Sequence, residues 1–128
     1  MTLTEHRCLI VDDSPTFCAA LRDMLEAAGM TVVATASTLD TAVEAAAAHE
    51  PDVILVDIDL GGESGFDVVE ALHDLHPARP PAVLLISTHD RDDFAEMVEA
   101  SSAMGFLQKF EISAELIAQT VARGRQCA

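Results

Sequence analysis

The chain has 128 residues, about the length of one domain, and half of its residues are apolar, which excludes a disordered protein. Asp and Glu number 22 against 7 Lys and Arg, and the resulting net charge of −15 argues against nucleic-acid binding by this chain. No apolar run reaches the ~18 residues of a membrane span, and residues 1–7 lack the layout of a signal peptide. We therefore expect a soluble protein that stays inside the cell.

The cysteines and histidines do not form a metal, redox or nucleophilic pattern. Cys8, Cys18 and Cys127 are odd in number and widely spaced, so the first two are interpreted as core residues rather than as part of a disulfide framework. The five histidines are scattered singly, without a partner at the spacing of metal ligands or of a catalytic triad. Among the basic residues six are Arg, and Lys109 is the single lysine, which makes it a candidate for a specific role.

The first predicted unit is a strand followed by a helix. Cys8–Val11 is a short apolar run that ends at the acidic pair Asp12–Asp13. Ser14 and Pro15 then provide an N-cap and a proline at the first helical position. Apolar residues recur at helical spacing after them until Gly29 ends the helix.

The next units repeat this order. Thr31–Ala36 predicts a second strand, and Ser37 or Thr38 can cap the Ala-rich helix that follows it. Val53–Val56 predicts a third strand, which is apolar throughout, as is typical of a strand buried on both faces. It also ends at an acidic residue, Asp57.

The remaining units complete the alternation of strands and helices. The third helix is expected at Phe66–Leu75. A fourth strand at Ala82–Ile86, followed by Ser87, leads to a fourth helix at Asp90–Ala100. A fifth strand at Met104–Gln108, followed by Lys109, leads to a last helix at Ile112–Arg123. Five strand–helix units with short loops predict a parallel sheet covered by helices on both faces. Without an internal repeat or a linker, the chain is expected to form one domain over residues 1–128, with a core of about 7–123.

Polar side chains stand where four of the predicted strands end. They are Asp12 and Asp13 after the first strand, Asp57 after the third, Ser87 after the fourth and Lys109 after the fifth. Ligands bind at the carboxyl ends of the strands in open parallel sheets, so we expect these side chains to lie at one edge. Crowded carboxylates favour a bound cation, and an all-oxygen site suits Mg²⁺.

These groups together favour phosphoryl transfer. An aspartate beside Mg²⁺ can act as a nucleophile toward phosphorus and form an aspartyl phosphate. The ammonium of Lys109 and the hydroxyl of Ser87 would then hold the oxygens of the transferring group. The sequence contains no P-loop, so nothing in it indicates a bound nucleotide as the donor.

The same positions make the chain resemble the response-regulator receiver domains of two-component signalling, from Cys8 to about Arg123. The motifs that carry the resemblance are Asp12–Asp13, the strand end Ile-Leu-Val-Asp57 with Gly65 beyond it, the hydroxyl of Ser87 and the late Lys109. The resemblance implies a doubly wound five-stranded parallel sheet in an α/β, (βα)5 flavodoxin-like three-layer sandwich. The stretch Ala103–Val121 is most similar to receivers attached to LuxR-type DNA-binding domains.

The resemblance also implies a role for each residue of the site. Asp57 would be the phosphoacceptor, assisted by Ser87 and Lys109. The Mg²⁺ ligands would be Asp13 and Asp57 directly, Asp12 often through water, and the backbone carbonyl of Asp59. Phe106 matches an aromatic position that swings inward on activation, although core packing alone is the other interpretation of this residue.

As a receiver, the chain would be a bacterial, cytoplasmic signalling phosphoprotein rather than a metabolic enzyme. A sensor histidine kinase or a phosphotransfer protein would supply the phosphoryl group, and the chain would catalyse its own phosphotransfer and slow dephosphorylation. Phosphorylation would change a surface that binds an output domain, a partner protein or a second copy of the chain. Because the sequence contains no helix-turn-helix module, we expect a stand-alone receiver or the front half of a longer regulator.

Two positions depart from the family pattern. Phe110 follows Lys109 where the family usually has proline, and a trans peptide is predicted there because a non-proline cis bond costs about 2.5–4 kcal/mol. The loop after Asp57 contains Gly61–Gly62, whereas the family often has a Met-Pro pair in this loop. This change predicts a more mobile loop.

Three alternatives are weaker. Asp57-Ile-Asp59 matches the nucleophile motif of haloacid-dehalogenase-type phosphatases, but Leu60 stands where that family needs Thr or Val, and their core usually needs a longer chain. An EF-hand beginning at Asp57 would lack its last acidic ligand, because position 12 is Val68. A degenerate receiver used only for protein binding is disfavoured because every site residue is present.

Overall fold

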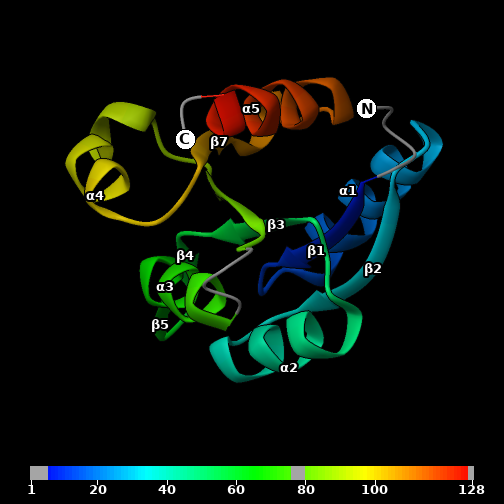
Figure 1. Cartoon of the computed structure of the whole chain (residues 1–128), viewed down its shortest axis with the longest axis horizontal. Coiled ribbons are helices and arrows are strands. Elements are labelled where there is room, and N and C mark those ends of the chain that lie inside the picture. Colours follow the sequence, from blue (N-terminus) through cyan, green and yellow to red (C-terminus); the bar gives the residue numbers. More distant parts are fainter. Residues whose placement is uncertain (1–5, 76–79, 127–128) are drawn as a thin grey trace.

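A computed structural model of the chain describes residues 6–75 and 80–126, in which one parallel sheet has the strand order β2-β1-β3-β6-β7 (Figure 1). Its strands are β1 (Arg7–Val11), β2 (Thr31–Ala36), β3 (Val53–Asp57), β6 (Ala82–Ser87) and β7 (Gly105–Gln108). The helices are α1 (Pro15–Ala27), α2 (Leu39–His49), α3 (Gly65–Leu75), α4 (Ala95–Ala100) and α5 (Ala114–Gln126). The predicted doubly wound, flavodoxin-like α/β sandwich is confirmed.

Two hydrophobic clusters fill the spaces between the sheet and its helical layers. Along β3 successive side chains point to opposite faces, so Leu55 packs in the cluster that contains α1 and α5. Its neighbours Ile54 and Val56 pack in the cluster with α2 and α3. Every residue of β3 is buried because this strand lies in the middle of the sheet. Full burial of one such aliphatic side chain contributes about 1.5–3 kcal/mol.

The register brings the carboxyl ends of four strands to one edge. Asp57, the last residue of β3, pairs with Ile86, and Ser87, the last residue of β6, pairs with Gln108 at the end of β7. β1 ends at Val11, level with the residue before Asp57. The chain crosses from one side of β1 to the other between β2 and β3, so this edge also holds the reversal of strand order at which ligands bind in such folds.

The first two helices begin at the predicted caps. The Ser14 hydroxyl accepts a hydrogen bond from the backbone N–H of Phe17 at 3.2 Å, with Pro15 at the start of α1. Thr38, the second of the two candidate caps, begins α2 and forms a reciprocal capping box with Thr41.

The helix predicted over residues 90–100 is interrupted. A 3₁₀ turn at Arg91–Asp93 precedes the six-residue α4, which buries none of its residues. Phe94 between them has φ −128°, outside the helical range, and its ring packs on Phe66 and His89 at centroid distances of 6.4 and 5.8 Å. We infer that these ring contacts stabilise the interrupted conformation more than one additional turn of helix would.

Two other elements differ from the sequence prediction. α5 begins at Ala114 because a 3₁₀ turn at Lys109–Glu111 and an extended Ile112 come before it. The loop after Asp57 folds into a two-stranded hairpin, β4 (Asp59–Leu60) and β5 (Glu63–Ser64), whose strands are too short to show a periodicity in the sequence.

The two described cysteines lie in the core, as predicted, and form no disulfide. Burial raises the pKa of the Cys8 thiol to about 12, so this thiol is neutral at physiological pH. Cys127 lies outside the described residues. Over residues 6–75 and 80–126, we find no helix whose length and hydropathy would let it cross a membrane.

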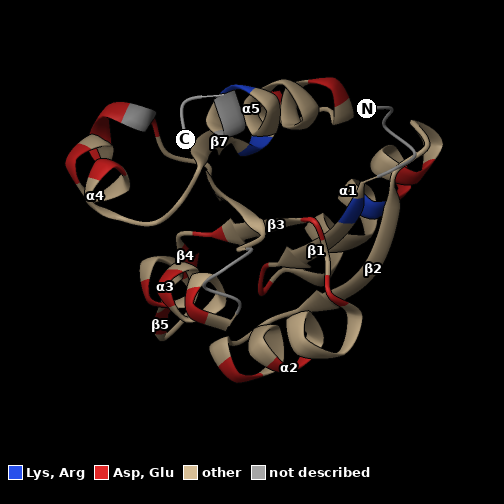
Figure 2. Ribbon diagram, viewed as in Figure 1, with Lys and Arg blue, Asp and Glu red and all other residues tan. Residues whose placement is uncertain are grey.

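Acidic residues are spread over the helices on both sides of the sheet, whereas the basic residues of the described chain are few (Figure 2). We predict that raising NaCl from 0.01 to 0.5 M will raise the melting temperature of the metal-free protein by roughly 3–5 °C, because salt screens the self-repulsion of a chain with net charge −15. Thermal unfolding followed by circular dichroism measures the shift. The shift should disappear near the sequence pI of about 4.3, and an equal shift there would contradict the prediction.

Candidate functional site

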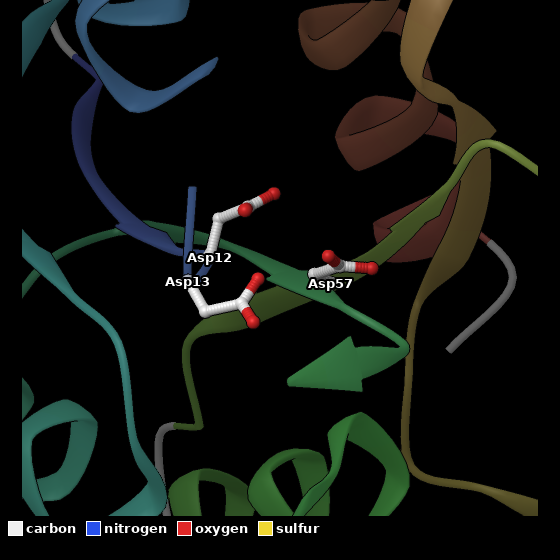
Figure 3. A group of neighbouring side chains, drawn as sticks. All are labelled: Asp12, Asp13 and Asp57. Atoms are coloured by element: carbon white, nitrogen blue, oxygen red, sulfur yellow. The ribbon is translucent and has the colours of Figure 1, made fainter. Parts of the chain in front are cut away.

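Three carboxylates meet at the carboxyl edge of the sheet (Figure 3). Asp12, Asp13 and Asp57 each have an oxygen within 4.8 Å of the others. Asp12 and Asp57 are buried at 3% and 7% exposure, whereas Asp13 is exposed. The N-cap residue of α1 fixes Asp12, because Asp12 Oδ1 accepts a hydrogen bond from the Ser14 N–H at 2.8 Å. The structure thus brings together the acidic residues that the strand ends predicted.

Lys109 lies against this carboxylate cluster. Its Nζ donates a hydrogen bond to Asp57 Oδ2 at 3.0 Å and forms an ion pair with Asp12 Oδ2 at 2.6 Å. The Phe17 ring of α1 covers the ammonium, with 4.4 Å between Nζ and the ring centroid, which is a cation–π contact. The single lysine therefore reaches the predicted phosphoacceptor.

Burial and the neighbouring groups act in opposite directions on the pKa values of Asp57 and Lys109. Burial raises the pKa of Asp57, although the hydrogen bonds from Lys109 and from the Asp59 N–H lower it in part. Burial lowers the pKa of Lys109, but contact with Asp12 and Asp57 outweighs that effect, so the pKa lies above its usual value. Lys109 therefore remains an ammonium, and one cation faces three carboxylates.

The donor set fits a hard cation. Asp12 Oδ2 is buried and accepts no hydrogen bond from the described chain, so its sole compensation there is the ion pair with Lys109. An oxygen of this kind, close to two further carboxylates, suits Mg²⁺, which takes oxygen ligands and keeps several waters. Asp59 is at the rim of the cluster: its N–H donates to Asp57 Oδ1 at 3.1 Å and its side chain is exposed.

Ser87 and Phe106 are placed by β6 and β7. Ser87 is buried, and its Oγ accepts a hydrogen bond from the His89 N–H at 3.0 Å, which leaves the hydroxyl proton to donate. Phe106 pairs with Leu85 in the sheet and is 6% exposed, within the cluster that contains α2 and α3. The ring is therefore directed into the protein in this conformation.

The two departures from the family pattern have different outcomes. No cis peptide occurs in the described residues, so the predicted trans bond between Lys109 and Phe110 is confirmed, and the Phe110 side chain is 75% exposed. The Gly61–Gly62 segment is the turn of the β4–β5 hairpin, with φ +73° at Gly61, a conformation that favours glycine. Its predicted mobility remains a prediction.

Several contacts of the site had no sequence signal. Phe17 and Cys18 have the helical spacing of core residues, yet Phe17 covers Lys109 and the Cys18 thiol donates to the Asp12 carbonyl at 3.5 Å. Gly65 packs so closely on β3 that a Cβ there would overlap the Asp57 carbonyl oxygen. A lone phenylalanine in a sequence does not indicate such a contact, and the family resemblance that includes Gly65 does not give its close packing.

Comparison with known proteins identifies the type of domain. The family model described as the response regulator receiver domain matches residues 8–121. A protein-glutamate methylesterase/protein-glutamine glutaminase from Natronomonas pharaonis is 39% identical over 103 residues, which cover 80% of this chain and 28% of that protein. The chain therefore spans under a third of the length of this relative.

Solved structures agree with this match. The signal receiver domain of the putative response regulator NarL from Mycobacterium tuberculosis has a TM-score of 0.76 and 30% identity, covering 94% of this chain and 96% of that one. A response regulator protein from Burkholderia pseudomallei, solved with a phosphorylated aspartic acid, a calcium ion and citrate, has a TM-score of 0.79 and 25% identity, covering 96% of this chain and 71% of that one.

Proposed function

This chain belongs to the response regulator receiver domain family of two-component signalling, and from that premise we propose that Asp57 is the residue that accepts the phosphoryl group. The observation that carries the proposal is the contact of the Lys109 ammonium with Asp57 Oδ2 at 3.0 Å, inside a cluster of three carboxylates. The phosphorylated aspartic acid in the Burkholderia pseudomallei structure supports the same chemistry. The phosphatase and calcium-loop alternatives gain no support from the comparisons.

The transfer step needs a nucleophile and groups that hold negative charge. An oxygen of Asp57 attacks the phosphorus of a phosphohistidine on the donor, so that a P–O bond forms while the P–N bond breaks. The electron pair of that bond remains on the imidazole nitrogen, which takes a proton from water. Lys109 and the Ser87 hydroxyl stabilise the charge on the transferring oxygens. Attack of water on the aspartyl phosphate later releases phosphate and restores the carboxylate of Asp57.

The acidic residues would hold the metal ion that this chemistry uses. Asp13 and Asp57 would bind Mg²⁺ directly, Asp12 through water, and Asp59 through its backbone carbonyl. When bound, Mg²⁺ neutralises charge on the cluster and on the phosphoryl oxygens. The ion pair of Asp12 with Lys109 would hold the ammonium beside the phosphoacceptor.

Phosphorylation would change the positions of Ser87 and Phe106. A phosphoryl oxygen that accepts a hydrogen bond from the Ser87 hydroxyl would draw this residue toward Asp57, and the His89 N–H that donates to Ser87 Oγ would move with it. α4 follows the segment that contains His89. Because this six-residue helix buries none of its residues, a movement of Ser87 and His89 would shift it readily. Phe106, which lies on the neighbouring strand β7, would repack against α4 and change the surface formed by α4, β7 and α5.

The partners of the chain follow from its place in a phosphorelay. The phosphoryl donor would be a sensor histidine kinase or a phosphotransfer protein, and the changed face would bind an output domain, a partner protein or a second copy of the chain. We assign one cytoplasmic receiver domain to residues 1–128, with a core of about 7–123. Its catalysis would be limited to its own phosphotransfer and slow dephosphorylation.

Incubation with a small phosphodonor tests the proposal without a known kinase. With acetyl phosphate and Mg²⁺, intact-mass spectrometry should detect the addition of one phosphoryl group, and chelation of the metal should abolish most of the product. Glu96→Gln, which removes an exposed carboxylate from α4, is the matched control and should react as the wild type does. A wild-type protein that acquires no phosphoryl group under these conditions contradicts the proposed function.

A further inference from the structure

The β4–β5 hairpin lies beside two of the three carboxylates of the cluster. The Asp59 N–H donates to Asp57 Oδ1 at 3.1 Å. The turn runs against Asp13, because a Cβ at Gly61 would lie 3.4 Å from Asp13 Oδ2. The hairpin thus contacts Asp57 through a hydrogen bond, and its turn runs beside Asp13.

The opposite side of the hairpin is attached to α2. Glu63 Oε1 accepts a hydrogen bond from the backbone N–H of Leu39 at 2.8 Å. Leu39 is the first residue of α2, where N–H groups have no partner within the helix and where a carboxylate is also favoured by the helix dipole. Thr38 already caps the N–H of Thr41, so Glu63 completes the capping of this terminus from a different part of the chain.

The hairpin has few other anchors. Leu60 is 4% exposed and packs in the core cluster with α2 and α3, but Gly61, Gly62 and Glu63 are exposed. A turn that contains two glycines has much conformational freedom in the unfolded chain and gains no side-chain packing from them. Ser64 Oγ ties the end of β5 to α3 by accepting a hydrogen bond from the Phe66 N–H at 3.2 Å, and the hydrogen bond of Glu63 attaches β5 to α2.

We propose that Glu63 is a positioning residue of the phosphoacceptor site, which holds the β4–β5 hairpin on the N-terminus of α2 and thereby sets the positions of Asp57 and Asp13 for metal binding. The inference rests on the proposed function only for the identity of the metal. Glu63 is not one of the three carboxylates of the cluster. Its effect is transmitted through the Asp59 N–H and the Gly61 backbone.

Three substitutions separate this role from an effect of charge. Glu63→Gln keeps an oxygen acceptor at the same reach and loses the charge, whereas Glu63→Asp keeps the charge and shortens the reach by one methylene. Glu63→Ala removes both. Positioning predicts that the Asp and Ala variants bind Mg²⁺ about threefold to fivefold more weakly, and that the Gln variant binds as the wild type does. A purely electrostatic role predicts the reverse order for Gln and Asp.

Calorimetric titration of the full chain with MgCl₂ measures the Mg²⁺ affinities. Hydrogen exchange of the metal-free protein measures whether the hydrogen bond between the Leu39 N–H and Glu63 is present. The Leu39 amide should exchange faster in the Asp and Ala variants and at the wild-type rate in the Gln variant. Asp67→Asn, a loss of charge at an exposed position in the first turn of α3, is the matched control and should change neither quantity.

The outcomes distinguish the two proposals. If the wild type binds no Mg²⁺, the metal site of the proposed function is contradicted, and this inference with it. If the wild type binds Mg²⁺ and all the Glu63 variants bind it equally, or if Gln weakens binding as much as Ala does, the positioning role alone is overturned. Faster exchange at Leu39 without any change in affinity also overturns it, because Glu63 would then be a helix cap only.

Discussion

Replacing Asp57 with asparagine will raise the free energy of unfolding of the metal-free protein by about 1 kcal/mol. Burial raises the pKa of Asp57, so the folded state disfavours its charged form. For an acid of this kind, stability is highest while the group is protonated and falls as the pH rises from the ordinary pKa to the raised one. Above the raised pKa the full cost applies, and the neutral amide removes it. Lys109 keeps its ion pair with Asp12 in the variant.

Mg²⁺ will reverse this order of stability. At a concentration of 100 times its Kd, a ligand that binds only the folded state adds about 2.7 kcal/mol, and Asp57→Asn should lose most of this gain because it lacks one of the carboxylates. Asp13→Asn should behave in the same way with a smaller metal-free increase, since Asp13 is exposed. Urea unfolding with and without chelator measures both effects, with Asp67→Asn as the control. If both site substitutions destabilise the metal-free protein, the burial and crowding of these carboxylates do not cost stability, and the account of the site is contradicted.

Acylation of Lys109 will abolish the conformational response to phosphorylation. The chain contains one lysine, so an amine-specific reagent has a single side-chain target besides the N-terminal amine. The Lys109 side chain is 15% exposed and its Nζ is bonded to Asp57, and a neutral amide cannot replace this cation beside a phosphoryl group. The response is measured as the change in hydrogen exchange of α4 on addition of acetyl phosphate, and it should be absent in the acylated protein.

A phosphoryl mimic should protect Lys109 from the reagent. With beryllofluoride and Mg²⁺, the rate of acylation should fall about tenfold, the equivalent of about 1.4 kcal/mol of added interaction with the ammonium. The N-terminal amine serves as the internal control and should react at the same rate in both conditions. Equal rates at Lys109 with and without the mimic would remove it from the mechanism.

The sequence was sufficient for the sheet and for most of the site because both depend on strand ends. Apolar runs that stop at Asp12, Asp57, Ser87 and Lys109 fix the register, and parallel pairing then brings these residues to one edge whatever the loops do. The caps at Ser14 and Thr38 were equally local, since each depends on a hydroxyl within three residues of its donor.

The parts that could not be predicted depend on contacts between distant segments. Phe94 interrupts the helix over residues 90–100 because Phe66, from α3, is close enough to pack with it. Phe17 has the spacing of a core residue, and its contact with Lys109 exists only once α1 and the end of β7 meet. Glu63 reaches Leu39 across 24 residues, a contact that no periodicity encodes.

Localisation of the phosphoryl group tests the central claim most directly. An acyl phosphate is reduced by borohydride, so treatment of the phosphorylated protein followed by peptide sequencing marks the modified carboxylate. We predict a single site at Asp57 and no phosphoryl adduct on the Asp57→Asn protein at the same Mg²⁺ and acetyl phosphate concentrations. A mark at any other residue, or an adduct that persists on Asp57→Asn, would contradict the assignment of Asp57 as the phosphoacceptor.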